Sequence, residues 1–314
     1  MSKAALSNPI FHDADKAREW LEARLWKDGP ICPKCGTVDE ATLMQGASHR
    51  PGLYQCNACR QPFTVTVGTL YERSKIPLNK WLAATHLMMA SKKGMSALEI
   101  GRLLGISKKS AWFLCHRIRE SLRPTSLTPM GGEGKFVEAD ETYIGGKETN
   151  KHRSKRNSKN IGGMGKEPVF ALVERKGQVR SQHVPGVSAK TLRPILVAQV
   201  DAKTFLMTDD AGQYRHMHKD FAHQTVNHGA GEYVRGEAHT NTIENYFSIL
   251  KRGITGTFHH VSQQHLKRYL AEFDYRYNER EALGVGDVER FEKSIPGIVG
   301  KRLTYRRING QTAA

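Results

Sequence analysis

The chain has 314 residues, which is enough for a catalytic core with one or two smaller modules. Hydrophobic residues make up 39%, a fraction typical of globular and not of disordered chains, and the formal net charge is +17. Such a charge predicts a polyanionic partner, because each Lys or Arg placed on a phosphate releases counterions. No run of about 18 apolar residues and no apolar N-terminal segment is present, so we expect a cytoplasmic protein without a membrane span or secretory signal.

Residues 1–75 contain two C-x-x-C pairs joined by a short intervening segment. Two such pairs let four thiolates complete the tetrahedral shell that zinc prefers, so the spacing predicts a zinc ribbon with structural Zn²⁺. A redox motif is the alternative, but a redox C-x-x-C usually occurs once. Gly36 follows the first pair, where a positive φ is often needed, and Cys115 is expected to be a buried small hydrophobe. The predicted zinc ligands are Cys32, Cys35, Cys56 and Cys59.

Residues 76–124 have helical periodicity, and their second half predicts a helix-turn-helix. Ser96 can cap the first helix with Glu99 as its capping-box partner, and Gly105 stands where that helix must stop. Ser107 is expected to cap the second helix. The expected buried face of the first helix consists of Leu98, Leu103 and Leu104.

The start of the second helix is the predicted DNA-contacting end of this segment. Lys108, Lys109 and Ser110 occupy it, and the N-terminal end of a recognition helix is where base and phosphate contacts occur. An ordinary helical hairpin with a basic face is the alternative. The positive charge of the chain, the predicted helix caps and the predicted turn all favour the DNA-binding interpretation.

Residues 130–285 predict an α/β domain, and residues 286–314 a basic C-terminal tail. The expected strands are 135–144, 168–174, 178–184, 204–208 and 224–228, and the expected helices are 188–200, 242–251 and 262–277. Three strands, then a helix and further strands, is the element order of a ribonuclease-H-like domain. The predicted fold class is therefore multidomain: a zinc ribbon, a helix-turn-helix and an α/β ribonuclease-H-like catalytic domain.

The segment between the first two of these strands, residues 145–166, is rich in Lys and Arg and poor in apolar residues. We expect a mobile basic loop that contacts the DNA backbone, with a tolerated surface insertion as the alternative.

Three acidic residues lie where elements of this domain begin or end. Asp140 lies near the end of the first strand, Asp209 ends the fourth, and Glu244 lies on the following helix. In a ribonuclease-H-like sheet the first and fourth strands are neighbours, so these carboxylates are expected to converge. Like charges repel at close range, and hard oxygen ligands suit Mg²⁺ or Mn²⁺, so a divalent cation is expected there. Strand alternation is taken to send Glu138 and Glu141 to the face opposite Asp140.

Several motifs together resemble the DDE transposases of prokaryotic insertion sequences that carry an N-terminal zinc ribbon, the ISXO-type family. The resemblance covers roughly residues 15–282. The motifs are the two cysteine pairs, Asp-Glu-Thr-Tyr-Ile-Gly-Gly from Asp140, Thr-Asp-x4-Tyr around Asp209, and the C-terminal stretches 239–254, 256–262, 265–273 and 276–280.

The resemblance implies that Asp140 and Asp209 are metal ligands, with Asp210 as the rival to Asp209. Glu244 follows Asp209 at a spacing that fits the DDE pattern and is the expected third ligand, while Asn241, one turn earlier, is the alternative. Lys251 lies two helical turns beyond Glu244, where it can hold a phosphate. Arg252 beside it is a further expected DNA contact.

The implied function is a transposase that binds the terminal inverted repeats of an insertion sequence and catalyses metal-dependent cleavage and strand transfer. Its expected partners are double-stranded DNA, as inverted-repeat ends and target, and further copies of the chain, because transposition requires two ends held together. We expect it in the cytoplasm, associated with the nucleoid. The alternatives are a non-catalytic DNA-binding regulator or inactivated copy, and a nuclease that only hydrolyses.

Overall fold

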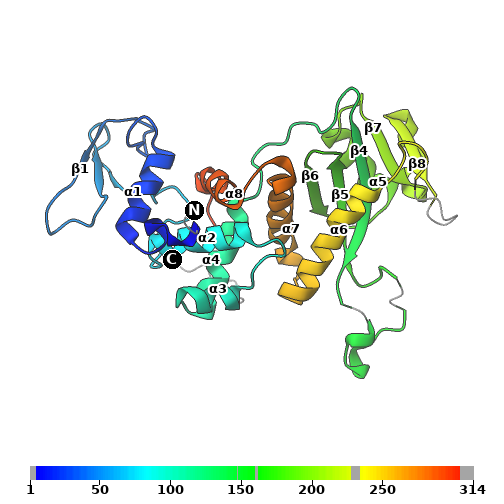
Figure 1. The fold of residues 1–314 in the computed structure, drawn as a ribbon, viewed down its shortest axis with the longest axis horizontal. Coiled ribbons are helices and arrows are strands. Elements are labelled where there is room, and N and C mark those ends of the chain that lie inside the picture. The colour runs from blue at the N-terminus through cyan, green and yellow to red at the C-terminus, as the bar shows by residue number, and fades with distance from the viewer. Residues whose placement is uncertain (1–4, 147, 160–161, 228–233, 305–314) are drawn as a thin grey trace. The chain divides into compact units, whose positions relative to one another are not determined.

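The structure is a computed structural model that describes the whole chain except residues 1–4, 147, 160–161, 228–233 and 305–314 (Figure 1). The chain divides into two compact units, one formed by residues 1–123 together with 285–314 and the other by residues 124–284. Within the described residues, every helix is too short or too polar to cross a membrane.

The first unit contains a small three-stranded sheet and five α-helices. The strands are β1 (Ala41–Leu43), β2 (Tyr54–Cys56) and β3 (Pro62–Phe63), paired antiparallel in that order. The helices are α1 (Ala14–Leu25), α2 (Leu78–Ala90), α3 (Ala97–Leu104), α4 (Lys108–Ser121) and α8 (Asp287–Ser294).

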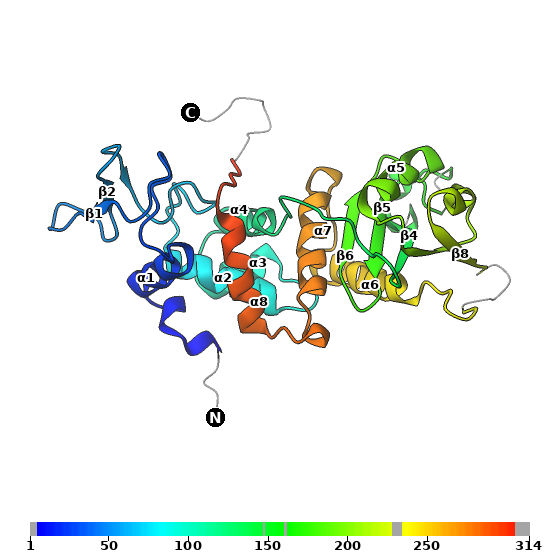
Figure 2. The same cartoon turned by 90° about the horizontal axis from the view of Figure 1, so that it is seen from above.

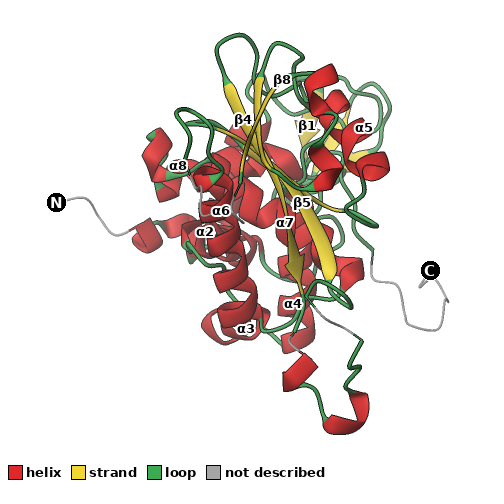
Figure 3. Ribbon diagram, turned by 90° about the vertical axis from the view of Figure 1, so that its right-hand side faces the viewer, coloured by secondary structure: helices red, strands yellow, loops and turns green. Residues whose placement is uncertain are grey.

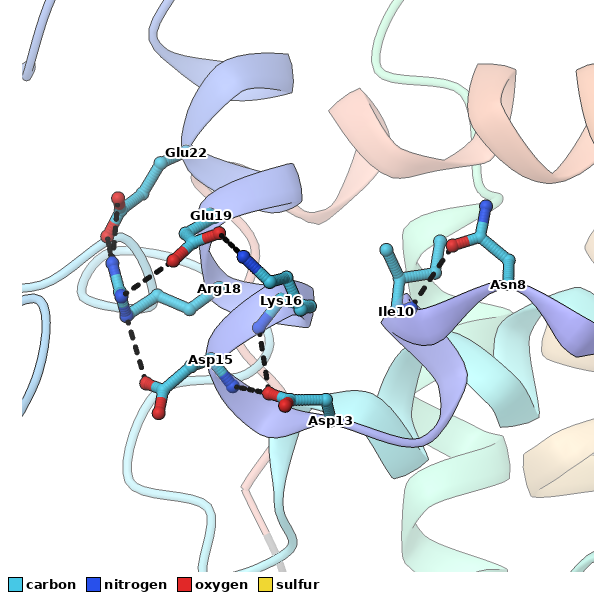
Figure 4. Close-up of polar contacts among 8 residues, drawn as sticks. All are labelled: Asn8, Ile10, Asp13, Asp15, Lys16, Arg18, Glu19 and Glu22. Carbon is cyan, nitrogen blue, oxygen red and sulfur yellow. Dashed lines mark hydrogen bonds and ion pairs between the residues drawn. The ribbon is translucent and has the colours of Figure 1, made fainter.

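Helix α1 begins at a side-chain cap, as Figure 4 shows. Asp13 Oδ1 accepts hydrogen bonds from the amides of Asp15 and Lys16, at 2.8 and 3.0 Å, which pairs two of the amides that a helix N-terminus leaves without partners. One turn later, Arg18 donates to both oxygens of Glu22 at 3.0 Å. Both side chains are mostly buried, and they lie against Gly52 of the ribbon.

Helices α3 and α4 form a tight hairpin whose caps are the ones that the sequence predicted. Ser96 accepts from Glu99 N, Ser107 accepts from Ser110 N, and Gly105 ends α3 at φ 60°. Cys115 is buried on α4, as predicted.

The predicted buried face of α3 is wrong for two of its three leucines, and the third, Leu104, is half-buried. Leu98 and Leu103 are 52% and 59% exposed, whereas Ile100 and Gly101 are buried. A Cβ on Gly101 would lie only 3.3 Å from Ala111 Cβ, so the helices meet closely at the glycine. Ile100 and Gly101 thus belong to the buried side of α3, and the two leucines lie outside it.

The predicted basic tail begins as folded structure, which differs from the sequence interpretation. Helix α8 places Phe291, 2% exposed, against the rings of Phe11 and Trp20, and Arg290 donates to Met89 O at 3.1 Å. The sequence signal was weak because α8 has only eight residues, most of them charged. Its core contacts come from segments distant along the chain.

We predict that Gly297→Ala destabilises the first unit. A Cβ at this position would lie 2.4 Å from the backbone oxygen of Ser121, so the C-terminal segment would have to shift. The expected cost is about 1–3 kcal/mol, measured as a lower urea midpoint of tryptophan fluorescence. All four tryptophans belong to this unit. Gly286→Ala is the matched control, because its Cβ would meet open space; equal midpoints for the two variants would contradict the prediction.

The second unit is built on a five-stranded mixed sheet in the order β6-β5-β4-β7-β8. Strands β4, β5 and β6 pair antiparallel in sequence, and β7 and β8 continue the sheet in parallel to β4. The strands are β4 (Phe136–Ile144), β5 (Glu167–Glu174), β6 (Val179–His183), β7 (Phe205–Asp209) and β8 (Ala222–Val226), and the helices are α5 (Ala189–Gln199), α6 (Asn241–Gly253) and α7 (Gln263–Asn278).

Helices cover both faces of this sheet, with α5 on one side and α6 on the other (Figure 2). Alternate residues of β5 supply the two cores: Val169, Ala171 and Val173 pack toward α6 and α7, while Phe170 and Leu172 pack toward α5. The hydrophobic run of β5 is the pattern expected of a strand buried on both faces.

The connection between β4 and β5 extends beyond the end of the sheet (Figures 1 and 3). It contains two short 3₁₀ turns, Glu148–Asn150 and Arg153–Lys155. The Arg156 guanidinium donates to the backbone oxygens of Thr149 and Lys151 at 2.8 and 2.9 Å. The predicted basic loop therefore lies outside the sheet, and its described part has local hydrogen bonds; residues 147, 160 and 161 lie outside the described residues.

A buried polar cluster joins α6 and α7 to β6. Asp274 Oδ1 accepts from the hydroxyls of Tyr246 and Ser181 at 2.5 and 2.7 Å, and Oδ2 accepts from Ser181 N at 2.8 Å. Burial nevertheless raises the pKa of Asp274 to about 7, because desolvation outweighs these donors.

This shift predicts that the second unit loses stability as pH rises. The folded pKa of Asp274 lies above its unfolded value, so the native state binds the extra proton between roughly pH 4 and 7, and the advantage is lost as pH rises through about 7. Between pH 5 and pH 8 the loss should be about 2–3 kcal/mol. Asp274→Asn should flatten the dependence in urea denaturation followed by circular dichroism, while tryptophan fluorescence of the first unit stays unchanged. An undiminished slope in the variant would contradict this assignment.

Candidate zinc site and candidate active site

The two cysteine pairs of the first unit fold into matching turns. Gly36 N donates to Cys32 O at 2.9 Å and Arg60 N donates to Cys56 O at 3.0 Å. Each turn ends in the left-handed region, at φ 78° for Gly36 and 59° for Arg60. The glycine was predicted; the arginine was not, because a non-glycine residue there gives no sequence signal.

The four sulfurs form one cluster whose ligand atoms all lie within 4.8 Å of one another. Cys32 Sγ lies 3.6 Å from Cys59 Sγ, and Cys35 Sγ lies 3.5 Å from Cys56 Sγ. A zinc–sulfur bond of about 2.3 Å implies tetrahedral edges of about 3.8 Å, so the cluster fits Zn²⁺. A hydrogen bond from Thr37 lowers the pKa of Cys35 to about 6, whereas at Cys59 a backbone hydrogen bond from Gln61 is outweighed by desolvation and the neighbouring sulfurs, which raise its pKa to about 12. Four thiolates at this distance repel one another unless a cation binds them.

Aromatic side chains support this cluster from one side. The rings of Trp26, Tyr54 and Phe63 lie 5.3 to 5.9 Å apart between centroids, and Phe63 packs with the buried cysteines. Such a core is small, so the ribbon depends on the metal for its stability.

In the second unit, β4 and β7 each carry one of the predicted carboxylates. These strands are parallel neighbours with Glu138 opposite Met207, and continuing that register places Asp140 opposite Asp209. Asp209 is the last residue of β7, where its Oδ1 accepts from Ala211 N at 3.1 Å. Both carboxylates are half-buried, whereas Asp210 is exposed.

The surroundings of Asp140 disfavour its negative charge. Burial raises its pKa to about 8, and the negative charges of Glu141, Asp209 and Glu244 add to the effect. The three predicted ligands therefore lie close enough to influence one another. Among the described residues only the cysteine set has ligand atoms all within 4.8 Å, so the three carboxylates lie further apart than this.

Helix α6 carries the remaining predicted active-site residues. Asn241 is its first residue and Glu244 lies in its first turn, and both are exposed. Thr240 Oγ1 donates to Glu244 Oε1 at 3.2 Å. Lys251 and Arg252 lie exposed in the last turn, and Arg252 Nε donates to Ser248 O at 3.1 Å.

The expectation that Glu138 and Glu141 share the face opposite Asp140 is wrong for Glu138. Residues two apart on a strand point to the same face, so Glu138 lies on the α6 side with Asp140. It is fully buried and accepts from Thr242 N and Ile243 N of α6. Glu141 lies on the other side, where it accepts from Gln213 and Tyr214. The two-residue spacing between Glu138 and Asp140 was the sequence signal that could have placed both side chains on the same face of the strand.

The predicted DNA-contacting residues of the first unit lie at the start of α4. Lys108 and Lys109 are exposed in its first turn, and Ser110 is half-buried beside them. Side chains at this end lie beside the amides that a helix N-terminus directs outward, a setting that favours phosphate.

The fold and these sites define a zinc-ribbon protein whose second unit is a mixed α/β sheet domain. A family model described as an ISXO2-like transposase domain matches residues 131–278, and one described as a transposase zinc-ribbon domain matches residues 12–62. The chain therefore carries an ISXO2-like transposase domain preceded by a transposase zinc ribbon.

Similar proteins include a curated relative from Halobacterium salinarum named as an uncharacterized protein in transposable element ISH50. It is 28% identical over 279 residues, which cover 85% of this chain and 91% of the relative. A solved structure of the simian T-cell lymphotropic virus intasome in complex with the PP2A regulatory subunit B56 gamma is also similar, at 12% identity and a TM-score of 0.27. That match covers 56% of this chain and 63% of the other.

We predict that Cys35→Ser abolishes stoichiometric zinc binding. Loss of one of four thiolates opens the tetrahedral shell, so purified protein should fall from about one zinc per chain to well below half, measured by mass spectrometry of the metal. Tryptophan fluorescence should show the ribbon unfolding, because Trp26 packs beside the cluster. Cys115→Ala, a buried thiol outside the cluster, should keep its zinc; full zinc content in Cys35→Ser would contradict the site.

Proposed function

We propose that this protein is an active transposase that binds the terminal inverted repeats of its insertion sequence and catalyses metal-dependent DNA cleavage and strand transfer. The observation that carries the proposal is the convergence of carboxylates from separate elements. Asp140 on β4 lies opposite Asp209 on the neighbouring parallel β7, and Glu244 lies in the first turn of α6, whose first amides contact Glu138 of the same strand β4. Such a cluster is costly unless a cation relieves the repulsion, which marks it as a functional site.

The strand order supports a ribonuclease-H-like assignment for this domain. Three antiparallel strands are followed by two parallel ones on the other side of β4, with α5 between β6 and β7 along the chain. In this order β4 is the central strand, and Asp140 on β4 lies beside Asp209 at the end of β7.

The donor set fits Mg²⁺ or Mn²⁺, since hard carboxylate oxygens suit these ions. We assign Asp140, Asp209 and Glu244 as the residues that would hold the metal, with Asn241 as the alternative to Glu244. Bound divalent cations would supply activation of the attacking water or 3′-hydroxyl and stabilisation of the leaving oxygen. We assign Lys251, which lies two helical turns beyond Glu244 on α6, to hold a phosphate.

DNA binding is assigned to the exposed basic side chains of both units. The α3–α4 hairpin has the caps and turn of a helix-turn-helix, and Lys108, Lys109 and Ser110 lie at the N-terminal end of its second helix. Arg252 adds a cation on the helix that carries Glu244. We further propose that the protein acts as a homo-oligomer on DNA in the nucleoid, since joining requires both ends of the element together.

We predict that Asp140→Asn, Asp209→Asn and Glu244→Gln each abolish strand transfer while end binding persists. Each removes a negatively charged oxygen from the proposed metal site, so joined product should fall by at least about 10³-fold in Mg²⁺. The measurement uses the full-length protein and labelled DNA carrying the ends of the parent element. Asp210→Asn is the matched control, because Asp210 adjoins Asp209 but is exposed.

Different outcomes separate the alternatives. End binding by the wild type without cleavage in Mg²⁺ or Mn²⁺ would indicate a regulator or an inactivated copy. If strand transfer survives Glu244→Gln but is lost in Asn241→Ala, Asn241 and not Glu244 would be the third metal ligand. Replacing Lys108 and Lys109 with Ala should instead weaken end binding and reduce its salt dependence by about two counterions.

A further inference from the structure

Glu138 is a fully buried carboxylate that none of the catalytic assignments above uses. It lies on β4, two residues before Asp140, with 0% exposure. An isolated buried carboxylate is strongly unfavourable, so its partners must account for its presence.

Those partners come mainly from the start of α6. Glu138 Oε2 accepts from Thr242 N at 2.8 Å and from Ile243 N at 2.9 Å, and Oε1 accepts from the Thr242 hydroxyl at 2.8 Å. The two amides are among those that a helix N-terminus leaves without partners, and a negative charge there is stabilised by the helix dipole. Since Thr240, the residue preceding the helix, makes no side-chain cap, Glu138 supplies the cap from another element.

A second set of contacts fixes the chain that leads into the helix. Arg175 Nε donates to Glu138 Oε1 at 2.8 Å, and its Nη2 donates to His239 O at 3.0 Å. His239 Nδ1 lies 3.2 Å from the same carboxylate oxygen. The Arg175 guanidinium also lies 5.0 Å from the centre of the Phe136 ring, so the cation is held against the sheet.

These contacts join the two elements that carry the proposed ligands. Glu138 is two residues from Asp140 on one side and binds the amides of Thr242 and Ile243 on the other, directly before Glu244. A shift of α6 along its axis would break both amide contacts. Each residue of a helix adds about 1.5 Å along the axis, so even a one-residue slip would move Glu244 far beyond the tolerance of a metal ligand.

We propose that Glu138 is a positioning residue: its carboxylate caps α6 and thereby holds Glu244, or Asn241, in register with Asp140 and Asp209. The role rests on the proposed metal-dependent function. Glu138 is not assigned as a metal ligand, because both of its oxygens accept hydrogen bonds from within the protein.

The test compares Glu138→Gln and Glu138→Ala with the wild type in full-length protein, using Mn²⁺ binding without DNA and amide hydrogen exchange of α6. Loss of a residue that orients metal ligands typically lowers affinity about 10–100-fold. We expect Mn²⁺ affinity, measured by electron paramagnetic resonance of the free ion, to fall in that range for Glu138→Ala. The Mn²⁺ affinity of Glu138→Gln should fall less, because the amide oxygen of the glutamine can still accept hydrogen bonds from the first amides of α6. Amide hydrogen exchange at residues 242–245 should be faster than in the wild type in both variants, and fastest in Glu138→Ala.

Glu174→Gln is the matched control. Glu174 also accepts a backbone amide, from Gly131 at 3.1 Å, and pairs with Lys135 at 2.8 Å, and neither partner lies on α6. This variant should bind Mn²⁺ as the wild type does. Thr242→Val removes only the hydroxyl contact to Glu138 and serves if the Glu138 variants do not fold; it should weaken Mn²⁺ binding several-fold and accelerate exchange at the start of α6.

The outcomes separate this role from the proposed function. A folded Glu138→Ala protein with unchanged exchange at residues 242–245 would overturn the positioning role. Unchanged Mn²⁺ affinity alongside faster exchange would also overturn it, since the cap would then be structural only. A wild type that binds no Mn²⁺ would overturn the metal-dependent function and, with it, the metal-directed role of Glu138, whereas the exchange measurement would still show whether Glu138 caps α6.

Discussion

The second unit depends on the parallel pairing of β4 with β7. The register of this pair places Asp140 opposite Asp209, so the two become neighbours although they lie far apart along the chain; Asp140 lies in the middle of β4 and not near its end, because β4 continues past the point where β7 stops. The antiparallel partners on the other side of β4 keep that strand central, and helices on both faces bury it. Asp140 is therefore held in a partly desolvated position that a surface strand could not provide.

Negative charge at this edge carries an energetic cost that the fold has to offset. Burial raises the pKa of Asp140, and the negative charges of neighbouring carboxylates raise it further. Glu138, two residues away on the same face, is buried more deeply but is matched by Arg175 and by the amides of α6. Glu138 is thus stabilised by partners within the protein, whereas Asp140 is the carboxylate that we propose a bound cation stabilises.

The zinc ribbon of the first unit has a small hydrophobic core, so its stability must come largely from another source. The ribbon has only short strands and a few aromatic rings, so a tetrahedral thiolate cluster replaces much of the missing apolar burial. The remaining helices of this unit are completed by α8, whose Phe291 packs against Phe11 and Trp20. The chain thus leaves the first unit, forms the second, and returns to close the core of the first.

The sequence by itself determined the features that depend on local spacing. Two C-x-x-C pairs specify a four-thiolate cluster, Ser96, Gly105 and Ser107 specify where α3 and α4 begin and end, and strand patterns predict the elements of the second unit nearly to their bounds. Its family motifs also identified the transposase domain. These signals are readable because each reflects contacts within a few residues.

Only the tertiary structure decided which faces are buried and which distant groups meet. Leu98 and Leu103 are apolar and were predicted to be core residues, but they are exposed, while α3 and α4 approach closely at Gly101 and Ala111. Residues 287–294 look like a charged tail, but they fold against aromatic side chains from the other end of the chain. The role of Glu138 likewise depends on amides 104 and 105 residues away. Burial and long-range hydrogen bonds are properties of the packed chain, and no pattern confined to one segment encodes the partner that another segment supplies.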